Sequence, residues 1–221
     1  MRLEILARPT QSFARVRLLP GESFAGESGA MVGMTTNIAM AQESGGLMGG
    51  LKRVFGGETI FRNTFAAQGS EGEVIFSTPL AGDMEILDVG DKQWCLQNSA
   101  YVASSTSVEV TSKSGKLKGF FSGAGSFVLG TRGSGYLVIG AFGAIEAIDV
   151  QGGMVIDTGH VIAWEASLSY QVEDNSRGII ASWLSGENLV CSFSGTGRAY
   201  LQTRNAADYG SSVGALLPPR S

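Results

Sequence analysis

Short apolar runs, separated by glycines and polar turns, recur along the whole chain. ARVRLL (14–19) alternates apolar and polar residues, as a strand with one buried face does. Further runs of strand length, each expected as a separate strand, are GEVIFST, WCLQ, AIDV, MVID, HVIAWEA, LVCSF and AYLQT. A helical period never persists beyond about two turns, and IAMAQ (38–42) and the residues around Leu51 are the best helix candidates. The pattern predicts an all-β protein.

The strand pattern also repeats. GDMEILDV (82–89) returns as GAIEAIDV (143–150), and glycine pairs precede strand-like runs three times, ending at Gly72, Gly135 and Gly197. Repetition at a nearly fixed spacing is typical of tandem modules. We therefore expect three modules, packed side by side. Their expected bounds are residues 1–80, residues 81–141, and residues 142–221 with a frayed tail after Asn205.

A glycine-rich insert, Ser44–Glu58, interrupts the first module and has no evident counterpart in the other two. Its apolar and basic centre, LKRVF, lies between glycine pairs, which favour unusual backbone conformations. We interpret it as a mobile loop that contacts a protein partner or a membrane surface, with Lys52, Arg53 and Glu58 as candidate binding residues.

Composition narrows the classes of function. The chain carries a formal net charge of −4 with 16% charged residues, which makes nucleic-acid binding a poor fit. The N-terminus lacks the apolar stretch of a signal peptide, and no window reaches the ~20 apolar residues of a membrane-spanning helix. These features predict a cytoplasmic protein. Cys95 and Cys191 lack metal-ligand spacing and are expected as buried, reduced thiols.

Glycine motifs that resemble catalytic or nucleotide-binding loops have simpler interpretations. GSSVG (210–214) matches a nucleophile elbow, but no histidine follows it. The glycines of GTRGSGYLVIG (130–140) precede a strand, whereas dinucleotide-binding glycines open a helix, so we expect a hairpin turn. Glu22, Glu27 and Glu58 fit solvated turns better than a cation site. The sequence thus predicts no catalytic residue, no metal and no cofactor.

Two further segments offer candidate binding residues. Asp157 and His160, in VIDTGHVIAW, form either a polar turn or a carboxylate–imidazole pair, and the turn is favoured. In LQTRN, Gln202 and Arg204 share one strand face, which suits a structural or interface role better than a ligand role.

Several segments in this order resemble the altered inheritance of mitochondria, or mitochondrial biogenesis, family. They are GESFAGESGAMVGMT, GGLMGGLKRVFGGETIFRNTF, FFSGAGSF, VIDTGHVIAWE and GTGRAYLQTRN. The resemblance covers nearly the whole chain. It implies three β-sandwich modules of the tryptophan RNA-binding attenuator type, a shortened double-stranded β-helix, and three chains closed into a ring. The family has no established catalytic residues.

These observations rank three functions. The leading hypothesis is a ring-forming scaffold or interaction protein, not an enzyme, that acts as a homotrimer. The alternative is a small-molecule binding protein or enzyme with a pocket near Asp157 and His160. RNA binding ranks last, because no lysine-rich element recurs in each module.

Overall fold

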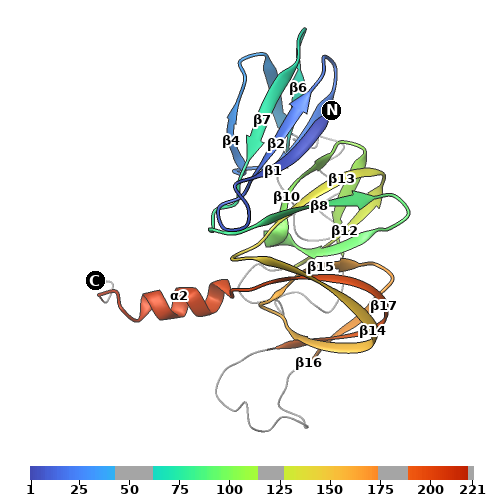
Figure 1. Cartoon of the computed structure of the whole chain (residues 1–221), viewed down its shortest axis with the longest axis vertical. Helices are drawn as coiled ribbons and strands as arrows, with labels where there is room; N and C mark the ends of the chain where they lie inside the picture. Colours follow the sequence, from blue (N-terminus) through green and yellow to red (C-terminus); the bar gives the residue numbers. More distant parts are fainter. Residues whose placement is uncertain (43–61, 114–126, 174–188, 219–221) are drawn as a thin grey trace, which may run out of the picture.

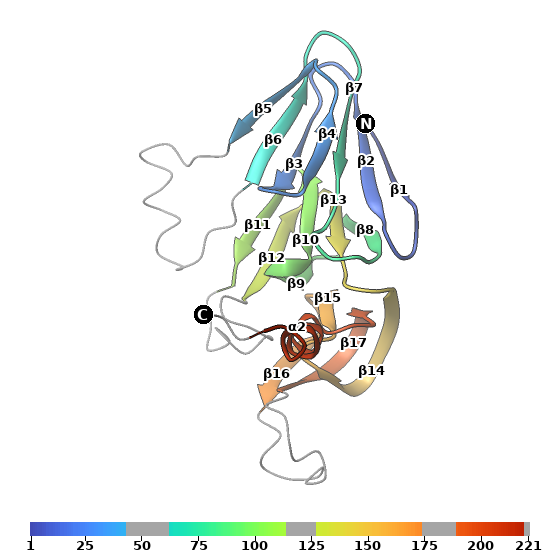
Figure 2. The same cartoon turned by 90° about the vertical axis from the view of Figure 1, so that its left-hand side faces the viewer.

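The fold is almost entirely antiparallel β-structure (Figures 1 and 2). The computed structural model describes residues 1–42, 62–113, 127–173 and 189–218 of the 221-residue chain. In these ranges the single α-helix, α2 (Ala206–Gly214), follows the last strand and projects away from the sheets. The all-β prediction is confirmed.

The strands fall into three series along the chain. The first is β1 (Arg2–Leu6), β2 (Phe13–Leu18), β3 (Ser23–Glu27), β4 (Met31–Met34), β5 (Ile38–Gln42), β6 (Arg62–Ala67) and β7 (Gly72–Phe76). The second is β8 (Met84–Val89), β9 (Trp94–Gln97), β10 (Tyr101–Ser105), β11 (Val108–Ser112), β12 (Val128–Gly133) and β13 (Gly135–Gly140), with a 3-10 turn at Asn98–Ala100. The third is β14 (Ile145–Asp157), β15 (Val161–Glu165), β16 (Ser169–Glu173) and β17 (Val190–Gln202).

The strands form three sheets, and two of these sheets join neighbouring series. A four-stranded sheet has the order β1-β2-β7-β4. A six-stranded sheet, β5-β6-β3-β10-β13-β8, combines strands of the first and second series. The last sheet, β11-β12-β9-β15-β17-β14, combines the second and third, and β16 also pairs with β17. The first series lies at one end of the long axis and the third at the other (Figure 1).

The glycines that mark the sequence repeat occupy matching places in the sheets. Gly72 lies opposite Leu18, Gly135 opposite Val89, and Gly197 opposite Val150. Each of these partners belongs to a strand, β2, β8 or β14, that pairs with the last strand of its own series. The spacing seen in the sequence therefore corresponds to one register of strand pairing.

Connections that lie outside the described residues fall at the same point of each series. Residues 43–61 join β5 to β6, residues 114–126 join β11 to β12, and residues 174–188 join β16 to β17. The Ser44–Glu58 segment therefore has positional counterparts, contrary to the sequence prediction, and it belongs to the longest of the three connections.

Four local predictions are wrong. IAMAQ forms strand β5, which pairs with β6, and not a helix. AIDV and MVID belong to one long strand, β14, and LVCSF and AYLQT belong to one long strand, β17. The tail after Asn205 forms α2, because the Asn205 side chain accepts a hydrogen bond from the amide of Ala207 and caps the helix.

The fourth error concerns GTRGSGYLVIG, which is not a hairpin. β12 and β13 follow one another in the chain, but they pair in different sheets. Gly133 and Gly135 have φ angles of 97° and 140°, and a Cβ at Gly133 would overlap the carbonyl oxygen of Ser107. These glycines let the chain cross between sheets, where a side chain would not fit.

Buried apolar side chains form three core clusters. The first contains Phe24, Phe65 and Phe76, the second contains Leu96, Leu129 and Leu137, and the third surrounds Trp164. The first cluster also takes in Met84, Val102, Ala103 and Val138 from the second series. The first and second series therefore share this core cluster. None of the helical residues that the structure describes forms a span long and apolar enough to cross a membrane.

Candidate functional site

Three of the predicted binding residues, Lys52, Arg53 and Glu58, lie outside the described residues. The remaining four, Asp157, His160, Gln202 and Arg204, lie close together where β14, β15 and β17 meet. The sequence reasoning placed them in two separate segments, and antiparallel pairing of β15 with β17 brings these segments side by side.

Asp157 and His160 form a polar turn between β14 and β15. The Asp157 Oδ1 atom accepts a hydrogen bond from the amide of Gly159 at 2.7 Å, and the amide of His160 donates to the Asp157 carbonyl at 3.0 Å. The Nδ1 atom of His160 lies 2.8 Å from the carbonyl oxygen of Gln202. A carbonyl oxygen only accepts, so this contact assigns the ring proton to Nδ1. The turn thus uses the carboxylate and the imidazole in separate contacts with the backbone.

Gln202 joins the same turn to the connection between β13 and β14. Its Oε1 atom accepts a hydrogen bond from the amide of Phe142 at 2.9 Å, and its Nε2 atom donates to the carbonyl of Gly159 at 2.8 Å. The backbone amide of Arg204 donates to the carbonyl of Phe142 at 3.2 Å. A side-chain amide that meets two backbone groups satisfies them without a ligand. This arrangement fixes how β17 leaves the sheet.

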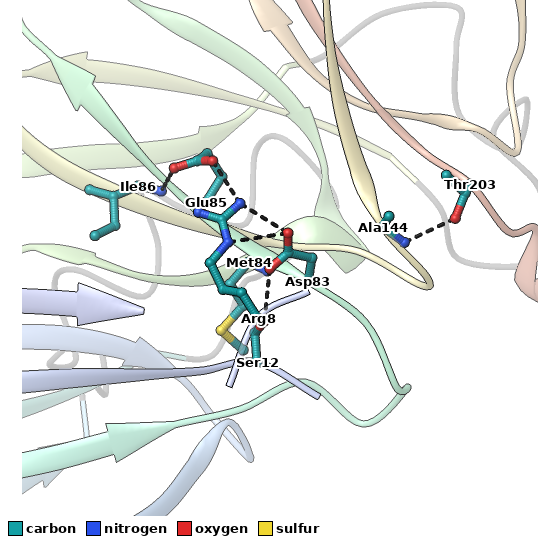
Figure 3. Close-up of polar contacts among 8 residues, drawn as sticks. All are labelled: Arg8, Ser12, Asp83, Met84, Glu85, Ile86, Ala144 and Thr203. Atoms are coloured by element: carbon teal, nitrogen blue, oxygen red, sulfur yellow. Dashed lines mark hydrogen bonds and ion pairs between the residues drawn. The ribbon is translucent and has the colours of Figure 1, made fainter. Parts of the chain in front are cut away.

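A second polar cluster lies between the first and second strand series (Figure 3). Asp83 is 3% exposed. Its Oδ2 atom accepts from Arg8 Nη2 at 2.9 Å, and its Oδ1 atom accepts from Ser12 Oγ at 2.7 Å and from the amide of Met84 at 2.8 Å. Arg8 also donates to Glu85 at 3.0 Å. The hydrogen bond to Asp83 raises the pKa of Arg8, with Glu85 acting in the same direction.

The backbone around Asp83 joins three segments that are distant in sequence. The amide of Asp83 donates to the carbonyl of Gly143 at 2.8 Å, and the amide of Ser12 donates to the carbonyl of Gly82 at 2.9 Å. The amide of Ala144, which occupies the place of Asp83 in the next sequence copy, donates to Thr203 Oγ1 at 2.9 Å (Figure 3). Sequence reasoning missed this cluster. Its only signal was the change from Asp83 to Ala144 within the repeated octapeptide.

Both cysteines are free and buried, as predicted. Burial raises the pKa of the Cys191 thiol to about 12. Lys113 Nζ lies 2.9 Å from Cys95 Sγ. The thiolate is the reactive form of cysteine, so Cys191 is protected from oxidation and alkylation near neutral pH.

The described part of the chain holds no group of three His, Cys, Asp or Glu side chains arranged for a metal ion. Glu22 accepts hydrogen bonds from the N-terminal ammonium at 2.7 Å and from the amide of Leu19 at 2.8 Å. Burial raises the pKa of Glu27. Glu22 therefore closes a turn, as the sequence indicates, and Glu58 lies outside the described residues.

The polar sites described above bind backbone groups and join strand series. A crystal structure of a protein from Streptococcus pyogenes matches with a TM-score of 0.82 and 27% identity, over 98% of this chain and 99% of that chain. An uncharacterised protein of Streptococcus pyogenes serotype M6 is 30% identical over 206 residues, which cover 88% of this chain and 82% of that protein. The family model of mitochondrial biogenesis AIM24 matches residues 3–204. The chain therefore belongs to the mitochondrial biogenesis AIM24 family.

Proposed function

We propose that the protein is a scaffold that works as a closed ring of identical copies, and not as an enzyme. This proposal rests on the positions of the large apolar side chains that are exposed. Within the described residues of 81–141, Tyr136 is the only exposed large apolar side chain. The outer series, by contrast, expose Met31, Val32 and Met34 on β4 and Met154 and Val155 on β14.

Exposed apolar groups at both ends of a molecule favour association of its copies. Two different patches that meet give head-to-tail contacts, and such contacts form a ring when the rotation between copies closes. β4 and β14 belong to the outer series, which lie at opposite ends of the long axis (Figure 1). Burying these patches would stabilise the contact by about 25 cal/mol for each Å² of apolar surface that is removed from water. The middle of the chain, which already has a neighbour on both sides, needs no such cover.

The proposed ring is a homotrimer of nine modules. We take residues 1–80, 81–141 and 142–221 as three modules of the tryptophan RNA-binding attenuator type, which is supported by the matching glycine registers at Gly72, Gly135 and Gly197. The number of three copies comes from the family resemblance. Contact of a partner or membrane with Ser44–Glu58 stays a prediction, because that segment lies outside the described residues.

Light scattering coupled to size exclusion tests the proposal. The expected molar mass is three times the 23.1 kDa of one chain, and it should persist on dilution to low micromolar concentration. A mass of one chain at all concentrations would contradict it. The alternative, a small-molecule site near Asp157 and His160, is less well supported, because both side chains already bind backbone groups.

A further inference from the structure

Strand series are joined twice within the chain by the same kind of strand pairing. The second series adds β10 to β3, with Ala103 opposite Gly26 and Ser104 opposite Ala25. The third series adds β15 to β9, with Ala163 opposite Leu96 and Trp164 opposite Cys95. Both pairings are antiparallel. Each junction thus makes one continuous sheet from two series.

β4 is the first-series counterpart of β10 and β15. All three strands pair with the last strand of their own series, and all three carry a bulge at one place. The bulge lies between Met31 and Gly33 in β4, between Tyr101 and Ala103 in β10, and between Val161 and Ala163 in β15. Gly33 therefore corresponds to Ala103 and Ala163, and Met34 corresponds to Ser104 and Trp164.

The second half of β14 is the counterpart of β3 and β9. The same number of residues separates Gly26 from Met31, Leu96 from Tyr101, and Ile156 from Val161. Ile156 therefore corresponds to Gly26 and Leu96, and Val155 corresponds to Ala25 and Cys95.

Within the described residues, β4 pairs only with β7, and β14 pairs only with β17. Other open edges, β5, β11 and β16, occur in all three series and so do not break the pattern. Among the described strands, only β4 and the second half of β14 lack a partner that their counterparts have. β4 lacks the neighbour that β10 has in β3 and that β15 has in β9. The second half of β14 lacks the neighbour that β3 has in β10 and that β9 has in β15.

Burial at matched positions supports the same conclusion. Val32 is 64% exposed, whereas its counterparts Val102 and Ile162 are 1% and 2% exposed. Val155 is 61% exposed, whereas its counterparts Ala25 and Cys95 are 0% and 1% exposed. An open edge with apolar side chains is a template for pairing with another chain.

We propose that β4 of one copy pairs antiparallel with the second half of β14 of the next copy, in the register of the junctions within the chain. Gly33 then lies opposite Ile156 of the other copy, and Met34 lies opposite Val155. The composite sheet has the order β16-β17-β14 from one copy followed by β4-β7-β2-β1 from the next. This inference rests on the proposed self-assembly and adds the surface and the register to it.

Disulfide trapping tests the register. The double variant Met34→Cys with Val155→Cys places two thiols directly across the new pairing, within the Cα separation of 4.4–6.8 Å that a disulfide needs. Mild oxidation should join chains into covalent dimers and trimers on a non-reducing gel. Either cysteine alone should leave single chains, since Cys95 and Cys191 are buried. Far-ultraviolet circular dichroism should confirm that each variant is folded.

A shifted pair is the matched control. Met34→Cys with Gly153→Cys puts the second thiol two residues away on the same face, where diagonal neighbours lie about 7–8 Å apart. Gly153 has space for a side chain, since its Cβ would meet only the carbonyl oxygen of Phe193 at 3.6 Å. Cross-linking of the shifted pair alone would overturn the register. An oligomer in which neither pair cross-links would overturn the choice of strands, while the proposed self-assembly would stand. A single-chain mass would overturn both proposals.

Discussion

At the scale of residues, polar side chains in this protein mainly satisfy the backbone where strand series meet. Gln202 satisfies backbone groups of Phe142 and Gly159, and Asp157 satisfies the amide of Gly159. Asp83 does the same between the first two series and is the most buried carboxylate in the described residues. Their contribution is the fixed geometry of the junctions, because an unpaired buried polar group costs more than a made hydrogen bond returns.

Asp83→Ala should destabilise the fold more than Glu85→Ala. The first change leaves Ser12 Oγ and the amide of Met84 without an acceptor in a buried place. We expect a loss of about 2 kcal/mol in the free energy of unfolding, since Arg8 is partly exposed and keeps Glu85. Glu85→Ala removes a more exposed ion pair and should cost less than about 1 kcal/mol. Urea unfolding of both variants measures the difference, and equal losses would contradict this role for Asp83.

The Cys191 thiol should be unreactive in the native protein. Its pKa of about 12 lies above the 9.0 of an exposed thiol, so almost no thiolate exists at pH 8. In a Cys95→Ala background, Cys191 should react with a thiol reagent only after unfolding in urea. A thiol whose pKa is raised by folding adds stability below pH 9, and this stability is lost as the pH rises from about 9 towards 12. Rapid labelling of the folded variant at pH 8 would contradict the burial.

At the scale of elements, the hydrophobic pattern predicts strands well and their ends poorly. β14 and β17 each read as two strands, because glycines interrupt the apolar runs. Gly152 and Gly195 lie opposite each other with φ angles of 89° and 103°, so the two strands bend together without losing their pairing. Five residues such as IAMAQ are too few to separate a helical period from a strand period.

The sequence likewise predicts the contacts of one candidate site and misses those of the other. Asp157 and His160 are neighbours in sequence, so turn chemistry alone predicts their local contacts. Arg8 lies between β1 and β2, and Asp83 lies just before β8, so only the fold brings them together, and no short motif records that pairing. The tail also carries a helix signal in its sequence, since Asn205 and Asp208 are typical of a helix N-terminus.

Asn205→Ala should fray α2, whereas Asn205→Asp should preserve it. The helix has no buried residue and one ring contact, between Tyr209 and Phe142, so its stability depends largely on its own ends. Losing the hydrogen bond from the Ala207 amide costs about 1 kcal/mol. The open state of the helix is then about fivefold more populated, and its amides exchange about fivefold faster. Hydrogen–deuterium exchange of peptides covering residues 206–214 measures this directly. Aspartate keeps an acceptor at the cap, so equal exchange in both variants would argue against capping.

At the scale of the whole molecule, the chain is an open series of sheets with two unlike ends. β4 and β14 are different in sequence and lie in the outer series, at opposite ends (Figure 1). A contact between unlike ends adds copies in one direction, and closure then sets the number of copies. This distinguishes the proposed ring from a two-fold dimer, in which each end would meet its own kind.

Variants that block one end each should restore association when they are mixed. A buried, unpaired carboxylate is costly, so Met34→Asp should block β4 and Val155→Asp should block β14, and each variant alone should be a monomer. In a mixture, the free β14 of the first variant meets the free β4 of the second, and the product should be a dimer of twice 23.1 kDa. Tyr136→Asp, on the exposed surface of the middle series, should keep the wild-type mass. Light scattering of the three variants and the mixture decides between the two arrangements. If either blocked variant still forms dimers alone, or if the mixture stays monomeric, the head-to-tail contact is wrong.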